Sequence, residues 1–216
     1  MIILAIETST AQGGVALLDG ERVLSSRQWM RAQSHSELLT AAIDDVLNEA
    51  KLSMQSIGAL AVGVGPGSFT GIRVAISAVK SLAFARNLSV FCFDSTEIIA
   101  AGRPQKDRPI IVALDAQKNQ LFHSEFEASK ELLPKRTSAL ELIDAAALKV
   151  DESKSILLGD GIEARPKTEF DFPRAEILGK LAWTYRASRS PLVWKDVQPL
   201  YLRTSGAEEK LRGSNG

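Results

Sequence analysis

Apolar runs and segments with helical spacing alternate along the first hundred residues. Asp19-Gly20 predicts a tight hairpin turn. The short apolar runs predict strands at residues 2–6, 15–18, 23–29, 59–63 and 90–93. Helical spacing predicts helices at residues 36–50, from a glycine-rich segment to about residue 86, and at residues 95–101. This order of elements predicts an α/β lobe whose sheet carries helices.

The same pattern restarts after residues 102–109, a polar and proline-containing stretch that predicts a linker. An apolar strand over residues 110–114 then ends at Asp115, as the first strand ends at Glu7. Because both halves open on an acid-terminated strand, we expect a duplicated lobe. The remaining expected elements are a hairpin strand at residues 121–126 and helices at residues 140–147 and 177–187.

These patterns divide the chain into two lobes. We expect an N-terminal lobe over residues 1–103 and a smaller C-terminal lobe over residues 104–216. From about residue 206 the sequence is polar and contains glycine, so this tail is expected to be mobile.

A glycine-rich turn over residues 63–73 joins the fourth strand to the long helix. Glycines there expose backbone N–H groups at a helix N-terminus, an arrangement that binds phosphate. Neither common phosphate pattern fits, because the turn lacks the Walker lysine and Ser68 stands where a dinucleotide-binding loop needs glycine. The alternative is a tight turn in which Ser68 or Thr70 caps the helix. The residues leave both interpretations open.

Charge and cysteine content narrow the functional classes. The chain has 26 basic and 26 acidic side chains, so it lacks the positive charge on which independent nucleic-acid binding depends. Cys92 is the only cysteine, which excludes an internal disulfide and fits a reducing compartment. No basic region precedes the first apolar run, and no run reaches membrane-spanning length. We therefore expect a cytoplasmic protein and, if RNA is involved, a partner that carries most of the contact.

Five stretches, in chain order, resemble the signatures of the bacterial TsaB (YeaZ) family. They are Leu4–Thr10, His35–Leu39, Val62–Arg73, Leu158–Gly161 and Pro199–Arg203. The sequence departs from the family pattern at Glu7, where the family usually has aspartate, and at Gln117, where it commonly has arginine. The resemblance covers nearly the whole chain.

This resemblance implies an α/β fold with two lobes like those of actin and hexokinase (the ASKHA fold), each a mixed sheet with helices. It also implies a non-catalytic scaffold that pairs with a homologous TsaD-type enzyme, which modifies the tRNA adenosine next to the anticodon with a threonylcarbamoyl group. A small TsaE-type ATPase is the further implied partner, and tRNA is expected to meet this chain only through the complex. We expect no cofactor of its own, with ATP or ADP placed at the interface of the complex.

Two strand-terminal acids are the candidates for nucleotide chemistry. In the superfamily, acids at the positions of Glu7 and Asp115 orient metal and water around a nucleotide phosphate. The favoured alternative is that each acid closes a strand and accepts local backbone hydrogen bonds, because Ala11-Gln12-Gly13 offers no phosphate-binding lysine or arginine. The candidate nucleotide-binding residues are Glu7, Ser9, Gly65, Gly67, Ser68, Asp115, Gly159 and Asp160.

The two histidines argue against metal chemistry. The enzymatic relatives carry two histidines four residues apart on the first helix, where they share a face and bind one metal ion. Here Leu39 follows His35 at that spacing, and His123 lies in the other lobe. We expect no metal site and no catalytic residue, and we expect His35 to face solvent or a partner at the helix start.

The long helix carries two apolar stripes that predict a docking surface. A seam of mostly small residues at spacings of three and four runs beside a bulkier stripe, so one stripe can cover the sheet while the seam admits another helix. The alternative is a helix buried wholly within its own lobe. The family pairs through its first two helices. The expected partner interface is therefore His35, Leu38, Gly71, Arg73, Ala75, Ala78, Leu82 and Ala85.

Three functional hypotheses follow. The leading one is the scaffold subunit for tRNA threonylcarbamoylation. The second is an autonomous nucleotide-binding ATPase of the ASKHA superfamily, which would use Glu7, Asp115 and the glycine turn. The third is a structural protein that forms a homodimer through the same helical seam.

Overall fold

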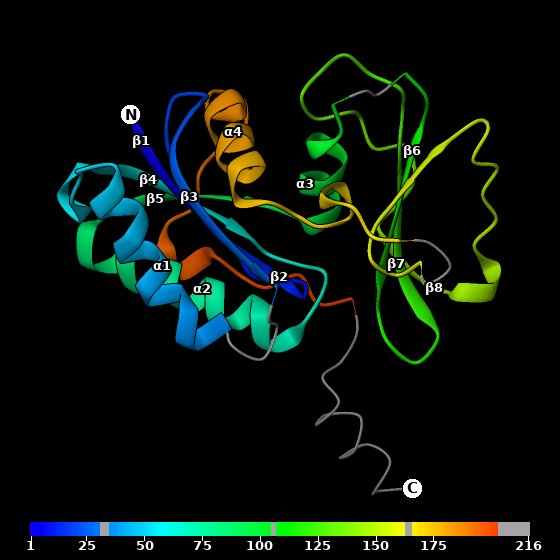
Figure 1. The fold of residues 1–216 in the computed structure, drawn as a ribbon, viewed down its shortest axis with the longest axis horizontal. Helices are drawn as coiled ribbons and strands as arrows, with labels where there is room; N and C mark the ends of the chain where they lie inside the picture. The colour runs from blue at the N-terminus through cyan, green and yellow to red at the C-terminus, as the bar shows by residue number, and fades with distance from the viewer. Residues whose placement is uncertain (31–34, 105–106, 163–165, 203–216) are drawn as a thin grey trace, which may run out of the picture.

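The computed structural model describes residues 1–30, 35–104, 107–162 and 166–202, which form two mixed sheets (Figure 1). The first sheet contains β1 (Ile2–Glu7), β2 (Gln12–Asp19), β3 (Arg22–Met30), β4 (Ile57–Gly63) and β5 (Ser89–Phe93). Their order is β3-β2-β1-β4-β5. The central strand β1 is antiparallel to β2 and parallel to β4.

Helices cover both faces of this sheet. The described α-helices are α1 (His35–Glu49), α2 (Phe69–Arg86), α3 (Ser95–Gly102) and α4 (Ala175–Tyr185). Successive side chains of a strand point to opposite faces, so β1 serves two cores. Leu4 and Ile6 pack with α1 and α2, whereas Ile3 and Ala5 pack with α3 and α4. Figure 1 shows α4 on the opposite side of the sheet from α1 and α2.

The second sheet repeats the strand pattern of the first. It contains β6 (Ile110–Asp115), β7 (Gln120–Phe126), β8 (Glu141–Asp144) and β9 (Ile156–Leu158), in the order β8-β7-β6-β9. Strand β6 is antiparallel to β7 and parallel to β9, as β1 is to β2 and β4. The acids that end β1 and β6, Glu7 and Asp115, therefore hold equivalent positions in the two sheets.

Helix α3 lies between the sheets and packs on both. Ile98 belongs to the core of the first sheet, while Ile99 and Ala100 belong to the core of the second. The Asp94 side chain caps this helix and also pairs with Arg136 of the second half at 2.5 Å. The same helix therefore connects the two cores.

One predicted element is wrong. Residues 140–147 form strand β8 followed by a 3-10 turn, Ala145–Ala147, in place of a helix. A helix of eight residues has little stability of its own, whereas the edge of β7 supplies backbone partners for a strand. Leu142 and Ile143 are half-buried, and they pair with Phe122 and Leu121.

The division into lobes at residues 103 and 104 stays a prediction. In the structure, residues that follow the second sheet pack back against the first sheet. Helix α4 packs on β1 and β2 of the first sheet. Farther along, Leu192 forms a bridge with Val90, and the Leu200 N–H donates to the Val64 carbonyl at 2.8 Å. The C-terminal segment thus runs beside the glycine turn at Leu200. The tail predicted from residue 206 lies outside the described residues.

Candidate functional site

The glycine turn ends β4 and begins α2, as the sequence predicts. Ser68 is the N-cap, and its Oγ accepts a hydrogen bond from the Gly71 N–H at 3.3 Å. The Ser68 N–H is already bound, because it donates to the Ser9 carbonyl at 2.7 Å. The cap predicted at Ser68 is confirmed.

The turn is packed closely against the backbone that follows β1. A Cβ atom on Gly67 would overlap the Ser9 carbonyl oxygen, and one on Gly71 would overlap the Thr8 carbonyl oxygen. Gly65 and Gly67 also have φ values of 95° and 153°, in the region that favours glycine. The approach that these glycines permit is therefore to the protein's own chain. This packing supports the interpretation as a structural turn.

Glu7 is fully buried at the end of β1. Its Oε1 accepts the Ser9 N–H at 2.6 Å, while no described residue donates to Oε2. The carboxylate lies over Gly63, where any Cβ atom would overlap Oε2. Burial raises the pKa of Glu7 to about 7, and the hydrogen bonds from Ser9 offset only part of that effect. With this pKa, the carboxyl group is protonated below neutral pH and ionises as the pH rises through about 7.

The predicted nucleotide-binding residues form two groups. In the first group, the Ser9 hydroxyl bonds to the Ser95 hydroxyl at 2.8 Å, close to Glu7 and the glycine turn. In the second group, the Asp115 N–H donates to Asp160 Oδ1 at 3.0 Å, and Gly159 precedes Asp160. Burial raises the pKa of the Asp160 carboxyl. Among the described residues, no hydrogen bond or ion pair joins the two groups.

Asp115 is exposed and bound to its own turn. Its Oδ1 accepts the Gln117 N–H at 2.7 Å. Gly159 has a φ of 114°, and a Cβ atom there would overlap the Ala113 carbonyl oxygen. This second group therefore has the same kind of internal packing as the glycine turn, together with local hydrogen bonds of the kind that closes a strand.

His35 is buried, so the prediction that it faces solvent or a partner is wrong. Its Nδ1 accepts the Trp29 Nε1–H at 2.9 Å, which leaves Nε2 protonated to donate to the Thr10 carbonyl at 2.9 Å. Burial lowers the pKa of this imidazole. His35 thus anchors the start of α1 to β3 and to the turn after β1.

The predicted interface residues on α2 divide between the inside and the outside of the first lobe. Gly71 and Ala75 are buried against the sheet side, with Ala75 fully inaccessible. Ala78 and Leu82 are half-buried, and Ala85 is exposed. The seam is therefore partly core and partly surface, because a row of small residues winds around the helix axis.

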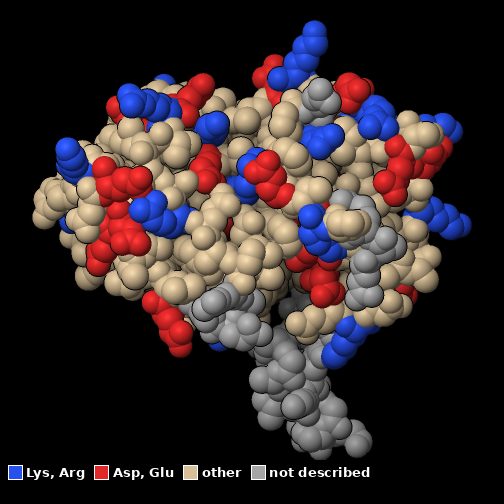
Figure 2. All heavy atoms as spheres, in the orientation of Figure 1, with Lys and Arg blue, Asp and Glu red and all other residues tan. Residues whose placement is uncertain are grey.

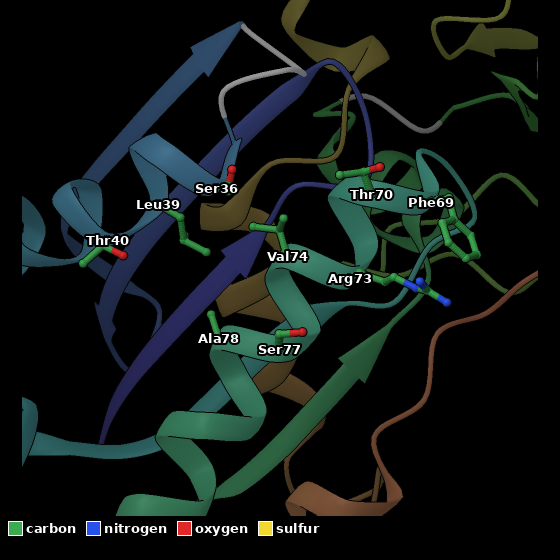
Figure 3. A pocket seen from close by; sticks show the side chains of 9 residues that line it. All are labelled: Ser36, Leu39, Thr40, Phe69, Thr70, Arg73, Val74, Ser77 and Ala78. Atoms are coloured by element: carbon green, nitrogen blue, oxygen red, sulfur yellow. The ribbon is translucent and has the colours of Figure 1, made fainter. Parts of the chain in front are cut away.

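A shallow groove of about 540 Å³ lies between α1 and the first half of α2 (Figure 3). Leu38, another predicted interface residue, is half-buried on α1 but does not line the groove. Apolar side chains alternate with hydroxyls along it, and one guanidinium stands at its border. The lining residues are Ser36, Leu39, Thr40, Phe69, Thr70, Arg73, Val74, Ser77 and Ala78.

An aromatic and cationic cluster forms the border of the groove. Phe69 stacks on Tyr201 with ring centroids 4.7 Å apart, and the Arg73 guanidinium lies 3.9 Å from the centroid of Phe69. Arg73 Nε also donates to the Tyr201 hydroxyl at 3.0 Å. Sequence reasoning selected Arg73 but missed Phe69 and Tyr201, because Tyr201 is 128 residues away and only the fold brings it here.

Comparisons with known proteins identify the family. The family model described as "TsaD: tRNA N6-adenosine threonylcarbamoyltransferase" matches residues 29–196. The "tRNA threonylcarbamoyladenosine biosynthesis protein TsaB" of Buchnera aphidicola subsp. Schizaphis graminum is 32% identical over 74% of this chain and 79% of its own length. The protein of the same name from Haemophilus influenzae is 25% identical over 99% of this chain and 98% of its own length. This chain belongs to the TsaB (YeaZ) family.

Solved TsaB (YeaZ) structures confirm the predicted fold class. YeaZ from Pseudomonas aeruginosa superposes with a TM-score of 0.81 and 27% identity, over 93% of this chain and 99% of that one. The two mixed sheets with helices are the two-lobed actin- and hexokinase-like fold. The repeated strand pattern around Glu7 and Asp115 is thus a property of the fold itself.

Within this TsaB-family chain, the described residues contain no cluster of histidine, cysteine and acidic side chains able to hold a metal ion. Leu39, four residues after His35, is buried in the core. No helix among the described residues is long and apolar enough to cross a membrane. On the face drawn in Figure 2, basic and acidic side chains are interspersed, as their equal numbers suggest.

Proposed function

We propose that this protein is a non-catalytic subunit for the formation of threonylcarbamoyladenosine in tRNA, and that it docks through α1 and α2 onto a TsaD-type homologous enzyme. The single observation that carries the proposal is its match to TsaB proteins over almost their whole length. The match of the TsaD family model to residues 29–196 supports a partner of related fold.

The interior of the first lobe supports a non-catalytic role. His35 is held in the core by Trp29 and Thr10, and Leu39 occupies the position of a second metal histidine. The glycine turn rests on the protein's own backbone, and Glu7 is closed off from solvent. These residues stabilise the lobe and leave its outer helices as the working surface.

The remaining partners follow from the same assignment. A TsaE-type ATPase joins the complex, and ATP or ADP binds where the subunits meet. The tRNA contacts the complex mainly through other subunits, because this chain has no excess of basic residues. A homodimer in the absence of the enzyme uses the same α2 surface and competes with the enzyme for it.

The experiment is reconstitution of tRNA threonylcarbamoylation from the homologous enzyme, the small ATPase, tRNA, ATP and the threonylcarbamoyl donor, with and without this chain. We expect modification only when the chain is present, together with co-elution of the chain and the enzyme. Full modification without the chain would contradict the proposal. Rapid, saturable ATP turnover by the isolated chain would favour the hydrolase hypothesis instead.

A further inference from the structure

Arg73 is fixed in place by two different contacts. Its guanidinium stacks on the Phe69 ring at 3.9 Å, and its Nε donates to the Tyr201 hydroxyl at 3.0 Å. Phe69 is itself stacked on Tyr201. An arginine held by its face and by Nε has lost most of its side-chain freedom before any partner arrives, so less conformational entropy is lost when it binds.

The two terminal nitrogens of the Arg73 guanidinium are available to a partner. The side chain is exposed, and no described residue accepts a hydrogen bond from its two terminal nitrogens. Other arginines of the chain use those nitrogens internally: Arg136 binds Asp94, and Arg189 makes two contacts with Glu97. A guanidinium fork with free terminal nitrogens matches the two oxygens of a carboxylate.

We propose that Arg73, positioned by Tyr201, is a preformed receptor for a carboxylate side chain of the homologous enzyme that docks on α1 and α2. This inference rests on the proposed function and adds the chemistry of one contact to it. The apolar residues of the groove, such as Val74 and Ala78, offer a docked helix an apolar contact surface. Burial of that surface is non-directional, so it does not orient the helix. A bidentate ion pair at the border of that area fixes the orientation of the partner.

Tyr201 is a positioning residue in this arrangement, since it contacts Arg73 and Phe69 but does not line the groove. The segment that carries it is tied to the glycine turn by the Leu200 N–H bond to Val64. The C-terminal segment therefore sets the geometry of a docking contact that residues of α2 provide. Figure 3 shows Phe69 and Arg73 on the same side of α2, away from α1.

The test measures the dissociation constant between the purified chain and the homologous enzyme over a range of salt concentrations. Arg73→Gln should weaken binding about tenfold or more and flatten the salt dependence, because the charge-assisted pair is lost. Arg73→Lys should restore the salt dependence but not the affinity, because an ammonium cannot form the fork. Tyr201→Phe keeps the aromatic stack and removes the acceptor for Nε. Its dissociation constant should lie between those of wild type and Arg73→Lys.

Arg186→Gln is the matched control. Arg186 also stacks on an aromatic ring, lying 3.6 Å from the centroid of Trp183, but it belongs to the α4 side of the sheet. This variant should bind the enzyme as wild type does. Thermal unfolding of each variant, followed by circular dichroism, should show a midpoint close to that of wild type, which separates lost docking from lost folding.

The outcomes separate this inference from the proposed function. If the wild-type chain does not bind the enzyme, the proposed function fails and the inference fails with it. If wild type binds and folded Arg73→Gln binds equally well with unchanged salt dependence, only the inference is overturned. In the last experiment, each exposed carboxylate on the enzyme is replaced in turn by its uncharged amide. One of these substitutions should weaken binding to wild type but have no further effect on binding to Arg73→Gln. If none behaves in this way, the receptor is not for a carboxylate of the enzyme.

Discussion

Glu7 and Asp115 end equivalent strands in two similar sheets, yet their surroundings are opposite. Glu7 is completely buried, and burial raises its pKa to about 7. Asp115 is exposed and accepts the Gln117 N–H in its own turn. The topology that places both acids is the same. The difference arises from what covers each strand end.

A shared fold need not carry shared chemistry, and this contrast shows how two equivalent strand ends come to differ. Above β1, the glycine turn and the start of α2 pack directly on the Thr8 and Ser9 backbone. That closure removes Glu7 from solvent. Above β6, only a short turn follows Asp115. A pair of acids that orients one metal ion needs both carboxylates open to the same space, and here only Asp115 is open.

The largest expected effect comes from pushing the start of α2 away from the backbone that follows β1. In Gly71→Ala the new Cβ would overlap the Thr8 carbonyl, which should cost about 3 kcal/mol of stability or more, well above the gain of about 1 kcal/mol from helix propensity. Denaturant unfolding measures the loss. Ser77→Ala, on the exposed side of α2, is the control and should change stability by less than about 0.5 kcal/mol. Equal stabilities for the two variants would show that the turn is not closely packed.

The next prediction concerns pH and tests the burial of Glu7. Its pKa is raised from 4.5 to about 7 in the folded protein, so its contribution to stability is intact below about pH 4.5 and is lost as pH rises through 7. The loss should be roughly 3 kcal/mol. Glu7→Gln should remove this decline and be more stable than wild type at pH 8.

Asp115→Asn is the matched control for that experiment. Because the Asp115 carboxylate is exposed, the variant should keep the decline of wild-type stability with pH. The measurement is the denaturant midpoint at several pH values for the three proteins. An identical pH dependence of wild type and Glu7→Gln would mean that Glu7 is not buried as described.

The third prediction tests whether the outer face of α2 is a docking surface. Ala78 is half-buried in the groove, so Ala78→Arg should weaken binding to the homologous enzyme about a hundredfold while the chain stays folded. Ala187→Arg introduces the same side chain at an exposed site after α4 and should bind as wild type does. Calorimetric titration and thermal unfolding give the two readouts. If Ala78→Arg unfolds the chain, this part of the helix is core and not a docking surface.

The smallest expected effect is at His35, which has the opposite dependence on pH. Its pKa is lowered by burial, so its contribution to stability is present above about 6.5 and is lost as pH falls below that value. His35→Ala leaves the Trp29 N–H unpaired and should cost about 1 to 3 kcal/mol at pH 8. Because the variant has no buried imidazole to protonate, the stability of His35→Ala should fall less than that of wild type between pH 7 and pH 5. An unchanged difference across that range would show that His35 is not held neutral.

Local pattern predicts much of this fold, because the decisive signals are short in range. The apolar run of β1, the Asp19-Gly20 turn and the Ser68 cap depend on neighbouring residues, and each is confirmed. The predicted helix at 140–147 is wrong because strand β8 depends on pairing with β7, which the local sequence does not encode. The solvent-facing prediction for His35 is wrong for a similar reason, since its partners Trp29 and Thr10 come from other elements.

The site shows the same limit more strongly. The seam on α2 singled out the helix, but spacing does not say how much of a stripe its own sheet covers. Ala75 is core, while Ala85 is surface. The role of Tyr201 could not be predicted, because its contacts with Phe69 and Arg73 depend on the return of the chain to the first lobe. Contacts between distant segments require the fold.

The most direct test of the central claim is the rate of tRNA threonylcarbamoylation by a reconstituted complex containing the Glu7→Gln/Asp115→Asn double variant. These are the two residues that any chemistry inherited from the superfamily would need in this chain. Our account predicts the wild-type rate, because the chain contributes a docking surface and no reacting group. A rate that collapses while the double variant still folds and binds the enzyme would contradict the account.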